Sequence, residues 1–114
     1  MQRIFFKEGG TVTAGNSSGI NDGAAVCILA SEEMVKQLGL KPMARIAGIG
    51  AAGVDPSIMG IGPVPASEKA LKNAGLTVNN LDIAELNEAF ASQVIASMRT
   101  LGIDRSIVNP NGGS

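Results

Sequence analysis

The chain has 114 residues, 45% of them hydrophobic, which suits one domain or part of one with a modest core. Nine basic residues, scattered along the chain, balance ten acidic ones, which excludes the electrostatic footprint of a protein that binds nucleic acid or an anionic membrane. With no histidine, one cysteine and no apolar run near the ~20 residues that cross a bilayer, the sequence also excludes an internal disulfide, a metal site of His and Cys ligands and a transmembrane helix.

The same features predict where the protein works and what it lacks. An unpaired cysteine fits a reducing compartment, and no basic-then-apolar leader opens the chain, so we expect a soluble cytoplasmic protein. Histidine is the side chain that most often transfers protons near neutral pH. Its absence means that these residues alone lack the usual general base.

The first third of the chain is predicted to be a loop followed by a strand. Residues 9–23, "GGTVTAGNSSGINDG", consist mostly of residues that favour turns. The run "AAVCILA" at 24–30 is entirely apolar, which is typical of a strand covered on both faces. Cys27 lies inside this run, and we interpret it as a packing residue and not a nucleophile, because apolar surroundings disfavour the thiolate.

The first helix is predicted within "SEEMVKQLG", directly after this strand. Ser31 is the expected N-cap, and two glutamates follow it at the positive end of the helix dipole. The buried face is predicted to consist of Met34, Val35 and Leu38.

The middle of the chain is predicted to hold a strand, a loop and a helix. "ARIAGIG" at 44–50 indicates the strand, although its glycines weaken the pattern. Residues 51–66 form a long loop rich in Gly and Pro, and loops of this length are often functional or mobile. A helix is predicted over 65–74, with a proline in its first turn. Its inward-facing residues are predicted to be Ala70, Leu71 and Ala74.

The last third is predicted to hold a strand at 81–86, the helix with the clearest pattern at 87–101 and a fourth strand at 106–110. Apolar residues of this helix recur at Phe90, Val94 and Met98, with Ala91, Ile95 and Leu101 beside them. The three predicted helices end in "LGL", "AGL" and "LGI", where glycine is expected to form the left-handed cap. Alternating strands and helices predict the α/β class, a sheet layered with helices.

Several polar or flexible residues have two interpretations when taken from the pattern alone. Asn87 is either the N-cap of the last helix or a polar group that a reaction needs, and the cap is the more common role. The loop "GNSSGINDG" is either a structural turn or an anion site, and it matches neither a Walker loop nor a dinucleotide fingerprint. Met59 is either a core residue or a flexible wall for a ligand.

Four phrases in the chain, taken in order, resemble the thiolases, the enzymes that make or cleave 3-ketoacyl-CoA thioesters. They are "GTVTAGNSSGINDGAA", "MGIGPVPA", "LNEAFA" and "VNPNGG", and the resemblance covers residues 6–113. The wording is most similar to the acetyl-CoA acetyltransferase branch of fatty acid metabolism. The resemblance implies a partial thiolase-like fold, a mixed β-sheet layered with α-helices. Residues 1–114 would then be a single partial domain, part of the C-terminal domain with the preceding CoA-binding loop.

The resemblance also implies a role for each matching position. Ser18 contacts the pantetheine arm of CoA, with Ala14 nearby. Met59 and Phe90 help to wall the acyl pocket. Asn87 holds a water that forms the oxyanion hole together with a histidine, which suits a donor held rigidly at a helix start.

Other parts of the family's machinery have no counterpart among these 114 residues. Thiolase chemistry needs a nucleophilic cysteine, the histidine of a "GHP" phrase and a second cysteine as acid and base. Pro110 is a minor departure from the family's wording. The resemblance therefore implies a fragment from the middle to C-terminal part of a thiolase, inactive alone, whose parent needs no cofactor beyond CoA as substrate and is a homo-oligomer. The alternative is a non-catalytic module that binds or self-associates.

Overall fold

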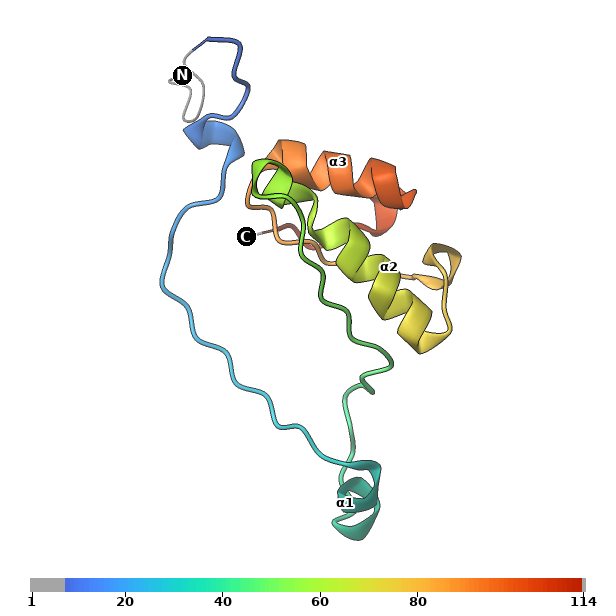
Figure 1. Ribbon diagram of the computed structural model, residues 1–114. Coiled ribbons are helices and arrows are strands. Elements are labelled where there is room, and N and C mark those ends of the chain that lie inside the picture. The colour runs from blue at the N-terminus through green and yellow to red at the C-terminus, as the bar shows by residue number, and fades with distance from the viewer. Residues whose placement is uncertain (1–7, 114) are drawn as a thin grey trace.

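The structure is a computed structural model that describes residues 8–113. Figure 1 shows a packed part built on α2 (Pro63–Ala74) and α3 (Ala91–Leu101), and a long loop that carries α1 (Glu32–Gln37) away from it. The Cα radius of gyration is 17.4 Å, whereas a compact domain of this length has about 13 Å. Short 3-10 turns complete the order: η1 (Ala14–Asn16), η2 (Pro56–Ile61), η3 (Val78–Asn80) and η4 (Arg105–Ile107).

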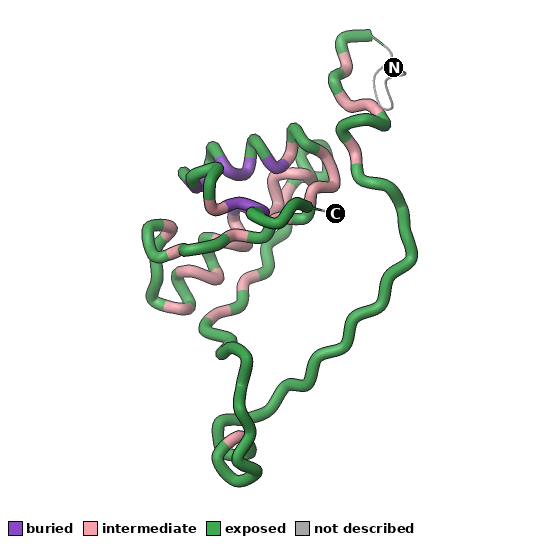
Figure 2. The backbone as a smooth tube through the Cα atoms, turned by 180° about the vertical axis from the view of Figure 1, so that it is seen from behind, coloured by how far each residue is buried: buried purple, intermediate pink, exposed green. Residues whose placement is uncertain are grey.

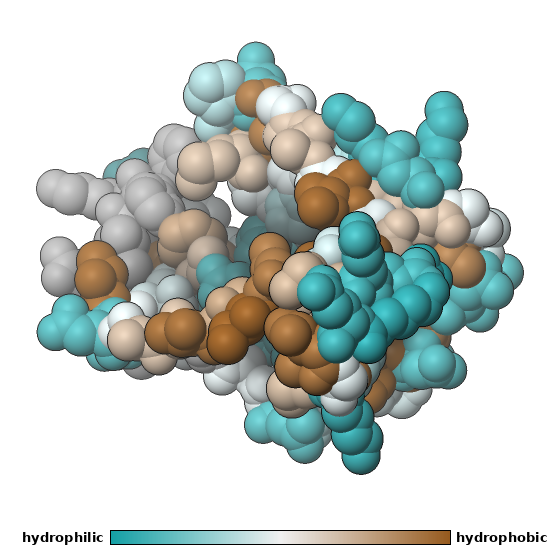
Figure 3. Space-filling view, turned by 90° about the horizontal axis from the view of Figure 1, so that it is seen from below, coloured by the Kyte–Doolittle hydropathy of each residue, from teal (hydrophilic) through white to brown (hydrophobic). Residues whose placement is uncertain are grey.

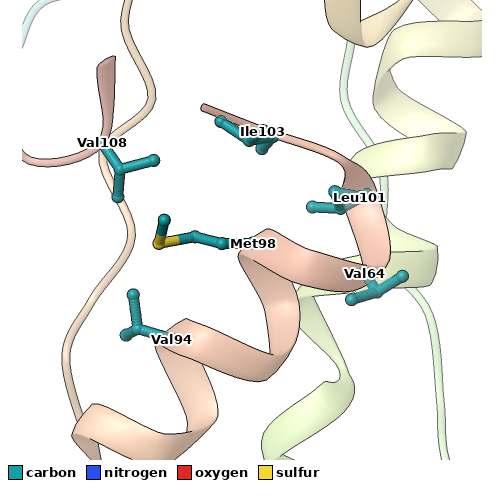
Figure 4. Close-up of a cluster of buried hydrophobic side chains, with 6 residues drawn as sticks. All are labelled: Val64, Val94, Met98, Leu101, Ile103 and Val108. Atoms are coloured by element: carbon teal, nitrogen blue, oxygen red, sulfur yellow. The ribbon is translucent and has the colours of Figure 1, made fainter. Parts of the chain in front are cut away.

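The core lies between α2, α3 and the chain that follows α3. Figure 4 shows the Met98 side chain between those of Val94 and Val108, and Val108 is only 1% exposed. Within residues 8–113 the core consists of the buried hydrophobic residues Val64, Val94, Met98, Leu101, Ile103 and Val108. Half-buried residues pack around them, namely Ile61, Val78, Leu81, Ala84, Leu86 and Ile107. Among the residues that the structure describes, the hydrophobic core thus lies in the second half of the chain.

Helix α3 confirms the predicted helix but begins four residues later than predicted. Its N-cap is Phe90, with extended backbone angles, and the residues before it are not helical. The prediction that Asn87 caps this helix is therefore wrong. The reason is tertiary: hydrogen bonds from other parts of the chain hold the segment before α3 extended, and these override the local helical pattern.

The predicted glycine caps are confirmed at the ends of all three helices. Each glycine has a positive φ, and the residue after it donates its backbone N–H to a carbonyl in the last turn. These bonds are Leu40 to Val35, Leu76 to Leu71 and Ile103 to Met98. The side chain of Ile103 is buried, whereas those of Leu40 and Leu76 stay exposed. The backbone motif therefore forms whether or not the side chain finds a partner.

The predicted mixed sheet is not confirmed within residues 8–113. The segments 24–30 and 44–50 form no β-ladder. The start of the strand predicted at 106–110 belongs instead to the 3-10 turn η4. The bridges between described residues are isolated: Ser17 pairs antiparallel with Phe90, and Ala84 pairs parallel with Val108. Figure 2 shows the chain through 24–30 exposed along its length. A strand needs a neighbouring strand to satisfy its backbone, and no part of the chain that the structure describes pairs with 24–30 or 44–50 in this way.

The predicted N-cap of α1 is confirmed, since the Oγ of Ser31 accepts from the backbone N–H of Met34 at 3.2 Å.

Two other predictions about the first third of the chain are wrong, because the described residues do not cover this part of the chain. The predicted buried face of α1 is not buried, because Met34 and Leu38 are exposed and Figure 1 shows the helix apart from the packed part. Cys27 is likewise exposed, not packed in a strand.

The glycines of the segment 44–50 let it approach α2 closely. A Cβ at Gly48 would collide with the carbonyl oxygen of Ala70, and one at Gly50 with that of Ala66. The Asn73 side chain holds the segment from α2 by donating to the carbonyl of Ile49 at 2.9 Å. The glycines that weaken the strand pattern are therefore needed for close packing.

Helix α2 begins two residues earlier than predicted, with Pro63 at its first position. The residues predicted to face inward, Ala70, Leu71 and Ala74, are half-buried. They line a mostly apolar cleft of about 460 Å³ between α2 and the segments 45–48 and 81–86.

Asp55 and Asp104 each begin a 3-10 turn in the same way. Asp104 accepts from the Oγ of Ser106 at 2.6 Å and from its backbone N–H at 2.7 Å. Asp55 makes the same pair of bonds with Ser57, at 2.6 Å and 2.8 Å. In each pair the serine hydroxyl, and after it the serine backbone N–H, lowers the pKa of the carboxyl group.

We expect Ser106→Ala to raise the pKa of Asp104 toward its ordinary value of 3.8 while leaving the pKa of Asp55 unchanged. A lowered folded pKa means that the stabilisation by Asp104 is present above pH 3.8 and is lost as the pH falls through the folded pKa. Carboxyl carbon chemical shifts followed by NMR through the acidic range measure both values. Ser57→Ala is the matched control, and an Asp104 pKa that does not respond to Ser106→Ala contradicts the assignment.

Candidate functional site

The segment 84–88 is held extended by the chain that follows η4. The backbone N–H of Ala84 donates to the carbonyl of Ile107, and the N–H of Asn109 donates to the carbonyl of Ala84, both at 2.9 Å. These two bonds form the parallel bridge between Ala84 and Val108. Since Val108 is a core residue, they fix the segment to the core.

The side chain of Asn109 continues this pairing beyond the bridge. Its Oδ1 accepts from the backbone N–H of Leu86 at 2.8 Å, and its Nδ2 donates to the Leu86 carbonyl at 2.8 Å. The same Nδ2 donates to Oε1 of Glu88 at 2.7 Å. Asn109 is 5% exposed and has a φ of +46°, a conformation that Asn tolerates better than most residues. Its amide thus takes the place of a neighbouring strand.

A cleft of about 430 Å³ opens beside this segment. It is lined by Glu85, Leu86, Asn87, Gly112 and Gly113. Asn87 is exposed on its wall, so the candidate catalytic residue is at a surface and not enclosed in the core.

The segment 84–88 and the glycine turn that faces it are in direct contact. A Cβ at Gly113 would collide with the carboxyl group of Glu88, so the glycine turn passes directly over that side chain. The lining offers a carboxamide and a carboxylate, and neither a thiol nor an imidazole. In the described part of the chain, no group of three or more His, Cys, Asp or Glu residues could hold a metal ion.

The loop predicted to contact CoA does reach this region. The backbone N–H of Ser18 donates to the carbonyl of Ala89 at 3.1 Å, and Ser17 pairs with Phe90. Ser17 also donates its Oγ to the carbonyl of Thr13 at 2.7 Å, which steadies η1. Ala14 in η1 and Ser18 are both exposed, whereas Phe90 is half-buried.

Met59 lies on η2, which packs against α3. Its side chain is 70% exposed, so it is not a core residue here. The neighbouring Gly60 lies against the side chain of Gln93, near the start of α3. Figure 1 shows η1 and η2 near the same end of α3.

The structure brings the segments that carry Ser18 and Met59 to the start of α3, but of the five predicted site residues Asn87 alone lines the cleft. It does so through contacts far apart in sequence, because Ser18 meets Ala89 and η2 meets α3. The sequence did not reveal the role of Asn109, whose side chain holds Leu86 and Glu88 on either side of Asn87. The available signal was an asparagine before a Pro-Asn-Gly-Gly turn, a setting that favours a left-handed backbone.

Comparison with known proteins identifies the family. Residues 40–114 match the family model of the thiolase C-terminal domain, and residues 1–33 match that of the thiolase N-terminal domain. The chain belongs to the thiolase family. The resemblance carried by the four sequence phrases is thus confirmed.

Thiolases of known name and structure match almost all of the chain. The acetyl-CoA acetyltransferase of Paracoccus denitrificans is 58% identical over 112 residues, 98% of this chain and 29% of that protein. The human mitochondrial 3-ketoacyl-CoA thiolase crystallised with CoA has a TM-score of 0.92 at 55% identity, over 97% of this chain and 28% of that one. The dimeric peroxisomal thiolase of Saccharomyces cerevisiae has a TM-score of 0.93 at 45% identity, over 98% and 28%. The chain thus spans less than a third of the length of these thiolases.

Two further findings concern the cellular setting. Among the helices that the structure describes, none is long and apolar enough to cross a membrane. The relatives include bacterial and mitochondrial proteins, so a cytoplasmic location stays a prediction.

Proposed function

We propose that these residues form part of the active site of an acetyl-CoA acyltransferase. The reaction is the thiolase reaction, the condensation of two acetyl-CoA to acetoacetyl-CoA or the cleavage of a 3-ketoacyl-CoA by CoA. Membership of the family and the names of the relatives support the reaction class. The observation that carries the assignment is Asn87, exposed on the wall of a cleft and held by a backbone that the buried Asn109 fixes.

Asn87 is the catalytic residue of this proposal. Its carboxamide holds the water that donates a hydrogen bond to the thioester carbonyl as negative charge develops on that oxygen. A donor fixed before the reaction does not have to reorient in the transition state, and one such donor contributes about 3 kcal/mol. The exposed side chain on a tethered segment meets both requirements, access and rigidity.

The four binding residues have separate tasks. Ser18 contacts the pantetheine arm of CoA and Ala14 lies beside it, which the exposure of both residues supports. Phe90 and Met59 wall the acyl pocket. The support is that the Ser18 loop pairs with the chain at 89–90, and that Met59 extends from η2 next to α3.

The proposal also concerns the domain organisation. We assign residues 1–114 to one partial unit, part of the C-terminal domain together with the preceding CoA-binding loop. The hydrogen bond from Ser18 to Ala89 ties that loop to the segment before α3, which supports this division. Residues 1–33, which include this loop, are similar to the N-terminal family model, and residues 40–114 to the C-terminal one. The site is then built where the two sequences meet.

The 114-residue chain alone is expected to show no thiolysis of acetoacetyl-CoA. Acyl transfer through a thioester enzyme needs an activated thiolate and a base, and this chain has no histidine and a single cysteine, exposed on the long loop. The absorbance of acetoacetyl-CoA in the presence of CoA measures the rate. The control is a chimera, called the Paracoccus chimera below, in which these residues replace the matching 112-residue stretch of the Paracoccus enzyme. Turnover by the pure chain would refute the proposal, as would an inactive but folded chimera.

A second candidate is a non-catalytic module that self-associates. It is favoured by the large hydrophobic residues exposed on the long loop, and Figure 3 shows hydrophobic side chains gathered on one face. These residues are Ile20, Val26, Ile28, Leu29, Leu38, Leu40, Met43, Ile46 and Ile49. Covering them with a second copy would also suit a homo-oligomeric parent. Sedimentation of the pure chain decides this, and a well-behaved monomer counts against it.

A further inference from the structure

We infer that Asn109 is a positioning residue that sets the orientation of Asn87. The inference rests on the proposed function, since it concerns the residue assigned there to the thioester. Asn109 does not line the cleft itself. It acts instead on the residues next to Asn87, through hydrogen bonds to Leu86 and Glu88.

The hydrogen bonds of Asn109 bracket Asn87 on both sides. Leu86, the residue before Asn87, is held through both its N–H and its carbonyl, and Glu88, the residue after it, is held through its carboxylate. With both neighbours fixed, the backbone at Asn87 has little freedom to rotate. The direction in which its side chain leaves the backbone is therefore set by one buried amide.

Only asparagine suits this position chemically. Its Oδ1 accepts one bond and the two hydrogens of its Nδ2 are both donated, so the buried amide is satisfied. Aspartate keeps the acceptor but loses both donors and places a second carboxylate beside Glu88. Glycine adopts the φ of +46° easily but carries no side chain.

The same residue also ties the opposite wall of the cleft. The backbone N–H of Gly112 donates to the carbonyl of Asn109 at 2.9 Å, which closes the turn that brings Gly112 and Gly113 over Glu88. The side chain of Asn109 thus holds the wall that carries Asn87, and its backbone carbonyl holds the glycine turn on the other side. Asn109 therefore sets the spacing between Asn87 and the glycine turn.

The test is a double-mutant cycle in the Paracoccus chimera. Asn109→Gly keeps the backbone angle and removes the clamp, and we expect kcat to fall roughly 10- to 100-fold through misplacement of Asn87, with the KM for acetoacetyl-CoA within about twofold. In an Asn87→Ala background the same change should alter kcat less than about twofold, because the residue that it positions is gone. A purely structural role would instead lower kcat by the same factor in both backgrounds.

Asn80→Gly is the matched control: like Asn109, Asn80 makes side-chain hydrogen bonds, in its case by accepting two from Thr77, but it lies in η3 and does not line the cleft. It should leave kcat unchanged. If Asn109→Gly does not fold, Asn109→Ser, which removes the amide without placing a charge beside Glu88, replaces it in the same cycle. Equal losses in both backgrounds, or no loss in either, overturn the inference alone. An Asn87→Ala chimera with undiminished kcat overturns the proposed function and this inference with it.

Discussion

Replacing Asn87 by alanine in the Paracoccus chimera is expected to lower kcat for acetoacetyl-CoA thiolysis by about 100-fold or more. The reason is the loss of a fixed donor at the developing oxyanion. The KM should change little, because an interaction made mainly in the transition state lowers kcat and kcat/KM together. Steady-state kinetics over a range of acetoacetyl-CoA concentrations measures both parameters.

The matched control for this variant is Asn79→Ala. Asn79 is an exposed asparagine on η3 and does not line the cleft. Its replacement should leave both kinetic parameters unchanged. Asn87→Asp tests whether a hydrogen-bond donor is needed at this position or whether any polar group is enough, since an aspartate keeps the size but places a negative charge where the donor stood. Full activity in Asn87→Asp would show that no donor is needed at this position.

Leu101→Ala is expected to lower the free energy of unfolding by about 3 kcal/mol. Leu101 is 8% exposed and belongs to a small core, which among the described residues comprises six buried hydrophobic side chains, so the cavity left by alanine has few neighbours able to fill it. A core of this size gives a total stability of about 5 kcal/mol or less. The variant chain should therefore keep about 2 kcal/mol of stability or less. Urea titration followed by circular dichroism measures the change.

Ile95→Ala, on the same helix, is the matched control for the core. Ile95 is 46% exposed, so its truncation removes less buried surface and should cost less than about 1 kcal/mol. If the two variants unfold at the same urea concentration, the core does not lie where the structure places it.

Local signals in the sequence were sufficient for the helices and their ends. Gly39, Gly75 and Gly102 each follow an apolar helical run, and a positive φ is the local consequence in every case. Val94 and Met98, four residues apart, became the buried stripe of α3. Such features depend on residues within one or two turns, which a sequence displays directly.

Features that depend on distant partners were not predictable in the same way. The helical pattern of 87–90 was real, but Asn109 and the loop at 17–18 hold this stretch extended. The apolar run 24–30 indicates that these side chains should be buried, but the sequence pattern does not say which other segment packs against them. Among residues 8–113 nothing does, and Cys27 is consequently exposed.

The candidate site divides in the same manner. The four phrases indicated the residues that would face a substrate, and the structure brings the segments that carry them to one end of α3. Their pattern could not reveal Asn109 as the support, because its partners lie more than twenty residues earlier in the chain. A side chain that only holds other residues leaves no signal that distinguishes it from an ordinary turn asparagine.

A crystal structure of the Paracoccus chimera with acetyl-CoA bound tests the central claim most directly. The account predicts the thioester oxygen in the cleft between Asn87 and the Gly112–Gly113 turn, with a water about 3 Å from both that oxygen and Asn87 Nδ2. A thioester bound elsewhere, with the Asn87 carboxamide pointing to bulk solvent, would contradict it.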